Sequence, residues 1–157
     1  MKKIINVCLV LLLSWMSATA QIANPFISMG TFPAVVVAPS GGGAGGNSTL
    51  QVTAGNAGND NIVTNSLEIT ITVGVNAEII TLAPGPLAAG SDVRWTVFSV
   101  TPGPGGTIKL RNTGAAPFLN FDLGTININI RGVAGGAGNI QGNIAYLFGP
   151  NAALGTS

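Results

Sequence analysis

The sequence of 157 residues predicts an all-β protein, an antiparallel β-sandwich of seven to eight strands. Three observations support this prediction. Apolar and polar residues alternate with a period of two, clusters rich in Gly, Asn and Pro separate the alternating segments, and helical spacing of apolar residues is absent after residue 20. Such alternation gives a strand one buried side and one wet side, as in an antiparallel sheet packed on a core.

The first 20 residues have the pattern of a cleaved secretory signal peptide. Lys2 and Lys3 precede a mostly apolar run from Ile4 to Trp15, and Ala18-Thr19-Ala20 forms a small-x-small cleavage pattern before Gln21. The apolar run is shorter than the roughly 20 residues that a membrane span needs. We therefore expect an exported protein, secreted or associated with a bacterial cell surface, without membrane insertion.

The composition argues against most chemistry. The sequence has no His, and its single Cys, Cys8, lies inside the apolar run of the signal, too early for a lipidated cysteine. Catalytic triads need a His, and zinc sites need His, Cys or clustered carboxylates. We therefore predict no enzymatic activity, no catalytic, cofactor-binding or metal-binding residues, and no cofactor.

The charge is low and scattered. Without Lys2 and Lys3, four basic residues stand against five acidic ones, a net charge of −1. Nucleic-acid binding needs clustered cations that neutralise phosphates, so we predict no nucleic-acid partner. The charged residues are Arg94, Lys109, Arg111 and Arg131 against Asp60, Glu68, Glu78, Asp92 and Asp122.

Residues 21–46 are expected to form a Pro- and Gly-rich leader. Three prolines interrupt this segment, Gly41–Gly46 has the composition of a flexible linker, and one short β-prone run, Val35–Val37, lies between Pro33 and Pro39. Three alternatives are open for Val35–Val37. The run is either the first strand of the domain, a strand donated to a neighbouring subunit, or a disordered segment.

The sandwich domain is expected over residues 47–148, followed by a tail over 149–157. The alternation is clear in four segments and blurred in three, and a short eighth strand is possible at Phe118–Phe121. Turn-forming clusters separate the segments, and a small closed barrel is the second choice of architecture. The clear segments are Leu50–Ala54, Leu67–Val73, Thr107–Arg111 and Ile126–Arg131, and the blurred ones are Ala77–Leu82, Val93–Val100 and Asn139–Phe148.

Several side chains can be assigned to a face in advance. In the segment 93–100, Val93, Trp95 and Val97 are expected on one face, and Phe98 and Val100 on the other. Trp95 is expected in the core, with Arg94 pointing outward. Glu68 and Lys109 alternate with apolar neighbours, so we expect both to point outward into solvent.

Two ligand hypotheses arise from the loops. The oxygen-rich stretch Asn56–Asn61 is compatible with a calcium site, but one carboxylate among several amides is a poor cage, and plain turn chemistry explains the same residues. Carbohydrate binding needs exposed aromatic residues, for which Phe118 and Phe121, beside Pro117, are the candidates.

Short motifs of this sequence resemble those of a known group. Leu50–Gly58 ends in an Asn-x-Gly turn, and the strongly alternating Asn65–Val73 follows. Together with Gly90–Trp95 and Gly106–Gly114, these stretches resemble bacterial surface Ig-like domains of the CARDB-like, cell-adhesion-related type, over roughly residues 48–148. The resemblance implies an Ig-like sandwich on the outside of a bacterium, without catalytic residues.

These observations lead to three functional expectations. The first is a non-catalytic exported surface module with an adhesion or architectural role. The second is a subunit of an extracellular fibre, assembled by strand donation from the N-terminal segment. The third is a carbohydrate-binding module. The expected partners are other surface proteins, copies of the same chain, or glycans.

Overall fold

The computed structural model describes residues 23–32, 46–58, 60–82, 85–133 and 139–147. The expected signal peptide, the run Val35–Val37 and the tail over 149–157 lie outside these described residues. Within the described ranges, no helix is long and apolar enough to cross a membrane.

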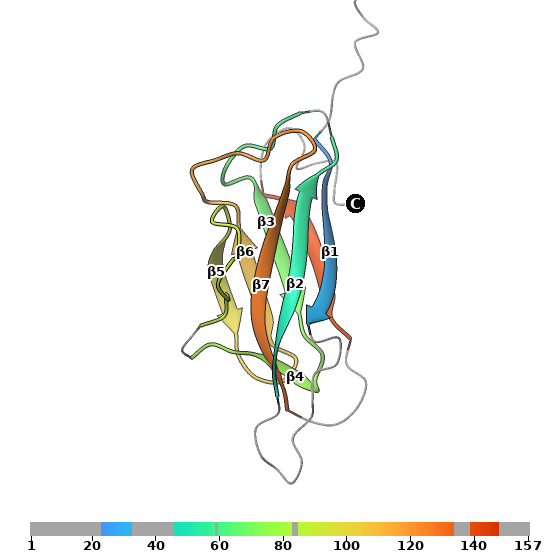
Figure 1. Ribbon diagram of the computed structural model, residues 1–157, viewed down its shortest axis with the longest axis vertical. Coiled ribbons are helices and arrows are strands. Elements are labelled where there is room, and N and C mark those ends of the chain that lie inside the picture. The colour runs from blue at the N-terminus through green and yellow to red at the C-terminus, as the bar shows by residue number, and fades with distance from the viewer. Residues whose placement is uncertain (1–22, 33–45, 59, 83–84, 134–138, 148–157) are drawn as a thin grey trace, which may run out of the picture.

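The described chain forms eight antiparallel strands in two four-stranded sheets that pack face to face (Figure 1). This confirms the predicted all-β sandwich of seven to eight strands. The first sheet has the order β1-β2-β7-β4 and the second the order β5-β6-β3-β8. The strands are β1 (Pro25–Phe32), β2 (Asn47–Asn56), β3 (Leu67–Thr72), β4 (Ala77–Ile79), β5 (Thr96–Thr101), β6 (Thr107–Arg111), β7 (Leu123–Gly132) and β8 (Gln141–Tyr146).

The strand pairs are nested along the sequence. β2 pairs with β7 in the first sheet, and β3 pairs with β6 in the second. The β3–β6 pair, which lies between β2 and β7 in the sequence, therefore packs against the β2–β7 pair across the core. In a constant-type immunoglobulin domain the second strand lies beside the fifth instead. The two sheets and their antiparallel pairing are therefore those of a sandwich, with a strand order of its own.

The core lies between the sheets and consists of the apolar residues of the alternating segments. In β7, Ile126, Ile128 and Ile130 are fully buried, while the residues between them are only partly covered. β2, β3 and β6 show the same alternation, as predicted. Each such side chain contributes about 1.5–3 kcal/mol through burial. The core residues of these three strands are Leu50, Val52, Ala54, Leu67, Ile69, Ile71, Ile108 and Leu110.

A strand within the expected leader corrects the predicted start of the sandwich. Pro25–Phe32 pairs with β2 along its whole length, from Pro25 opposite Asn56 to Phe32 opposite Thr49. Ile27 and Met29 pack against the core. Pro25 is tolerated because it is the first residue of an edge strand, where its missing N–H removes no bond from the ladder. The sandwich therefore begins before residue 47.

β1 also lies against the opposite sheet. A Cβ atom built on Gly142 of β8 would come within 2.7 Å of the Met29 Sδ atom and 2.9 Å of the Ile27 Cδ1 atom. A side chain at residue 142 would therefore displace the ends of the Met29 and Ile27 side chains. This contact closes one side of the sandwich.

Two predicted segments have different boundaries. Phe118 forms a single bridge with Ile62 and then enters a turn, so 118–121 is not a strand. In the segment 93–100, Trp95 is buried but Val93 is 87% exposed, because the chain turns before Thr96 as it crosses between the sheets. The expected common face of Val93, Trp95 and Val97 is therefore wrong.

The other blurred segments are shorter than predicted. β4 ends at Ile79, and β8 covers Gln141–Tyr146. After β4 the chain stays beside β7, since the backbone at Ile80, Ala88 and Asp92 donates hydrogen bonds to carbonyl groups of β7. Irregular pairing of this kind leaves no alternating pattern that a sequence could reveal.

Replacing Ile128 by Ala tests the position of the core. Ile128 is fully buried in β7, so the variant should lose about 2–5 kcal/mol of unfolding free energy, measured by urea denaturation. Leu82→Ala is the matched control, because Leu82 is exposed and its truncation should cost less than about 0.5 kcal/mol. Equal losses in both variants would contradict the assignment of the core.

Candidate functional site

The outer surface of the second sheet carries an ordered array of polar side chains, which we call the polar face. The strand register places its residues in three rows that run across β8, β3, β6 and β5. The rows are Gln141-Thr72-Thr107-Thr101, Asn143-Thr70-Lys109-Ser99 and Ala145-Glu68-Arg111-Thr96.

The polar face is a direct consequence of the alternation that builds the core. Ile69 and Ile71 of β3 are buried, so Glu68, Thr70 and Thr72 project to the other side of the sheet. Threonine suits such positions because its β-branched side chain favours the extended backbone while its hydroxyl group stays available to solvent. The array is therefore both stable as a sheet and rich in hydrogen-bonding groups.

One end of the polar face holds a small charged cluster. The Glu68 carboxylate accepts hydrogen bonds from the Lys109 Nζ atom at 3.0 Å and from the Arg111 Nε atom at 2.9 Å. Both cations come from β6, the strand that pairs with β3. Glu68 is only 11% exposed, which corrects the prediction that it is fully solvated, while Lys109 does point outward as expected.

A stacked aromatic ring borders this cluster. The Arg111 guanidinium lies 3.3 Å from the centroid of the Phe98 ring, a cation–π contact. Phe98 sits at an irregularity in the pairing of β5 with β6, between Val97 and Ser99. Phe98 lies on the same side of β5 as Thr96, and the bulge places the next residue, Ser99, on the polar face as well, where Phe98 remains exposed.

The electrostatics of the cluster favour an ionised carboxylate. Burial raises the pKa of Glu68, but hydrogen bonds and charge from Lys109 and Arg111 outweigh that effect and hold the pKa below its usual range. A carboxylate held in this way is a poor proton acceptor at neutral pH, and so its role here is to fix the two cations.

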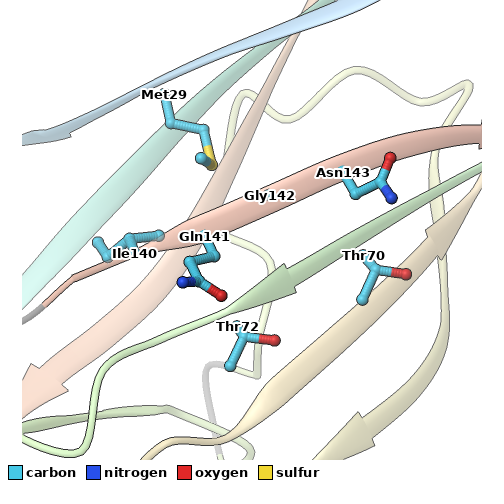
Figure 2. Close-up of a pocket in the computed structure, with 7 residues that line it drawn as sticks. All are labelled: Met29, Thr70, Thr72, Ile140, Gln141, Gly142 and Asn143. Carbon is cyan, nitrogen blue, oxygen red and sulfur yellow. The ribbon is translucent and has the colours of Figure 1, made fainter. Parts of the chain in front are cut away.

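An open pocket of about 580 Å³ lies on the polar face beside the β1–β8 contact. In Figure 2, Thr70 and Thr72 lie on β3, Gln141 and Asn143 on β8, and Met29 on the other side of β8. The volume is within the range of about 300–1,000 Å³ that is usual for ligand sites. The pocket thus combines a polar floor with apolar edges formed by Met29 and Ile140.

Most of the polar side chains in this pocket are uncommitted. Thr72 shares a hydrogen bond of 3.0 Å with Thr107, but the side chains of Thr70, Gln141 and Asn143 make none within the described part of the chain. Hydroxyl and amide groups both donate and accept hydrogen bonds. They are therefore free to bind a ligand that carries hydroxyl groups.

At the end of the sandwich near Trp95, the aromatic and charged side chains stabilise the fold through contacts with one another. Trp95 is buried as predicted, and its ring lies 5.6 Å from that of Phe118. Arg94 stacks on Phe118 at 3.8 Å and forms ion pairs with Asp92 and Asp122, so it does not point outward beside Thr96 as predicted. Phe118 is therefore enclosed and unsuited to stack on a glycan.

The Asn56 side chain holds the loop Asn56–Asn61, the stretch considered for calcium binding, in place. The Asn56 Oδ1 atom accepts hydrogen bonds from the backbone N–H groups of Asn24 and Gly58, and its Nδ2 atom donates to the carbonyl oxygens of Asp60 and Leu119. These bonds use the hydrogen-bonding capacity of the side chain to join three segments. Plain turn chemistry therefore explains Asn56, which is not arranged as an ion ligand.

The side chains at these sites supply hydrogen-bonding groups, ion pairs and aromatic rings. Among the described residues, no group of three acidic side chains is placed to hold a metal ion. The sequence identified Glu68 and Lys109 as outward residues and placed Phe98 on the face opposite Trp95, but it missed that the bulge turns Val100 toward the core. It also missed the pocket, because Met29 comes from the segment interpreted as a leader.

No protein-family model matches the chain, and no curated protein matches it significantly. Among solved structures, it is similar to a biomass-sensoring module of the Rsgi2 protein of Clostridium thermocellum, described as resembling a family 3 carbohydrate-binding module of the cellulosome. The identity is 10%, the TM-score 0.47, and the match covers 71% of this chain and 67% of that one.

Two further structures show a comparable similarity. One is AvmM, which catalyses macrocyclization in alchivemycin A biosynthesis, at 15% identity and a TM-score of 0.44, over 81% of this chain and 76% of that one. The other is the CBM3a-L domain of the scaffoldin cipA of the cellulosome of Clostridium thermocellum, at 13% identity and a TM-score of 0.39, over 83% and 92%. At such low similarity none of them assigns a function to this chain.

The low pKa of Glu68 makes part of the stability dependent on pH. Because the pKa is lower in the folded than in the unfolded state, the stabilisation is complete above 4.5, the ordinary value, and is lost as the pH falls below it. Glu68→Gln should therefore be less stable than the wild type at pH 7, with the difference shrinking at pH 3, as measured by urea denaturation. A difference that stays constant between the two pH values would contradict this coupling.

Proposed function

We propose that the protein is a non-catalytic adhesion module of a bacterial surface, and that the polar face binds a polysaccharide. The observation that carries this proposal is the ordered array of hydroxyl and amide side chains over four strands, with an open pocket of about 580 Å³ at one edge. Such a surface can bind a polysaccharide through hydrogen bonds alone, without a catalytic residue.

The array matches the chemistry of a polymer of sugars. A polysaccharide presents hydroxyl groups at regular intervals, each of which donates and accepts hydrogen bonds, as Thr, Asn and Gln side chains do. Two of the three rows repeat hydroxyl and amide groups, so that weak bonds add along one ligand chain. Phe98, already stacked on Arg111, offers its exposed ring surface to the apolar face of a sugar ring.

The proposed place at the cell surface rests on the sequence. The signal-peptide pattern of residues 1–20 and the absence of a thiol after Cys8 suit an exported protein. The resemblance of residues 48–148 to CARDB-like surface domains supports the same location. A module of this kind attaches a larger assembly or a cell to a glycan-covered surface.

Two of the described edge strands, β4 and β5, do not favour the alternative of fibre assembly by strand donation. β4 is an edge strand of only three residues, and β5 is interrupted by the bulge at Phe98. Bulges on edge strands hinder pairing with another chain. Electron microscopy of the purified protein tests the alternative, and regular fibres would support it over a monomeric adhesion module.

Binding to insoluble cellulose and chitin and to soluble polysaccharides tests the proposal, by pull-down and affinity electrophoresis. The triple variant Thr70→Ala/Gln141→Ala/Asn143→Ala should weaken binding at least about tenfold, because each lost hydrogen bond removes roughly 0.5–1.5 kcal/mol. The matched control is Ser28→Ala/Gln51→Ala/Thr53→Ala, which removes three polar groups from the outer surface of the first sheet. Equal binding by both variants, or no binding by the wild type, would refute the proposal.

A further inference from the structure

The loop between β6 and β7, together with the first residue of β7, exposes three large apolar side chains. Leu119, Phe121 and Leu123 are 51%, 67% and 58% exposed. They lie at the end of the sandwich where β7 begins, away from the β1–β8 pocket, and the polar face does not include them. Their exposure is not explained by the fold, since none of them fills the core.

Phe121 holds a backbone conformation that its side chain disfavours. Its φ angle is 57°, in the left-handed region, and the Asp122 N–H donates to the Leu119 carbonyl at 3.2 Å, which closes a β-turn with Phe121 as its third residue. Gly or Asn is the usual choice at a turn position with positive φ. The sequence instead places a Phe there and leaves its ring in solvent, so the strain is not repaid by burial.

The surrounding structure fixes this turn from both sides. The buried Asn56 side chain donates to the Leu119 carbonyl, and the Asn56 N–H donates to the Asp122 carbonyl at 3.0 Å. Arg94 pairs with the Asp122 carboxylate while it stacks on the enclosed Phe118 ring. Phe121 is therefore displayed on a firmly anchored turn, as a preorganised contact needs to be.

Exposed polar residues lie in and beside the turn that carries Phe121. The Asn120 N–H donates to the Asn61 Oδ1 atom at 3.2 Å, which brings the loop between β2 and β3 beside the turn, with Asp60 next to Asn61. Within the described part of the chain, the Asn120 amide and the Asp60 carboxylate make no side-chain hydrogen bond. An aromatic ring next to uncommitted amide and carboxylate groups is a suitable arrangement for a sugar ring.

We propose that Phe121, Asn120, Asn61 and Asp60 form a second binding site, which takes a single sugar unit at the end or branch of a glycan. The sugar stacks its C–H face on the Phe121 ring, and its hydroxyl groups bond to the amide and carboxylate groups. The charge at the site disfavours an anionic membrane, because Asp60 and Asp122 lie there and the nearby cation, Arg94, is paired. This site is independent of the polar face.

Chemical-shift mapping with cellohexaose, xylohexaose and N-acetylchitohexaose tests the site in the full-length protein. At least one of these oligosaccharides should shift the amide signals of Asn120, Phe121 and Asp122. Phe121→Gly should weaken this binding at least about tenfold, while Phe121→Tyr and the control Leu82→Ala retain it. The triple variant of the polar face should retain it too, which separates failure of this site from failure of the polar face.

A stability measurement distinguishes a binding residue from a structural one. Glycine accepts the positive φ angle, so Phe121→Gly should have a Tm equal to that of the wild type or higher. A Tm lower by more than about 4 °C would show that the ring stabilises the fold, and would overturn the proposal. The absence of shifts with all three oligosaccharides, or Phe121-dependent sedimentation with phosphatidylglycerol vesicles instead, would also overturn it.

Discussion

The packing of β-branched side chains between two sheets is the constraint on which the whole molecule depends. Ile69 and Ile71 of one sheet and Ile126 and Ile128 of the other are completely buried. Because a strand presents successive residues to opposite sides, fixing these four inward also fixes their neighbours outward. A slip of one residue in register would exchange the core with the surface, and so the interior determines where every outer side chain stands.

The polar face is a direct result of this constraint, because the same strands that bury the isoleucines expose the residues between them. The pairing of β3 with β6 and β8 aligns hydroxyl, amide and charged groups into rows. Ion pairs then order the charged end, where Glu68 holds two cations from the neighbouring strand. The side chains of this charged end are held before a ligand binds, which reduces the entropy that binding would cost there.

The sequence predicted the regular part of this structure and missed the irregular part for physical reasons. Two-residue alternation in 67–73 and 126–131 is a local signal, so these strands were predictable. The inward direction of Val100 was not predictable, since it depends on a bulge that only the pairing of β5 with β6 reveals. β1 was missed because Pro25 argued against a strand, although an edge position tolerates it.

The candidate sites were predictable only in part for the same reason. Phe121 stood out as an aromatic residue beside a loop proline, but Phe118 has the same local setting and is buried. What separates them is the tertiary stack of Trp95 and Arg94 on Phe118. The pocket on the polar face joins β1, β3 and β8, which are distant in sequence, so local patterns could not indicate it.

The contact between β1 and Gly142 has a consequence for how the molecule opens. β1 and β8 belong to different sheets and approach through side chains, with Met29 and Ile27 over a glycine backbone, whereas β1 is held by a backbone ladder on its β2 side alone. An element bound on one side is the first to detach in native fluctuations. Water would thus enter the interior beside Gly142, and amide protons of β1 would exchange before those of β7, which has partners on both sides.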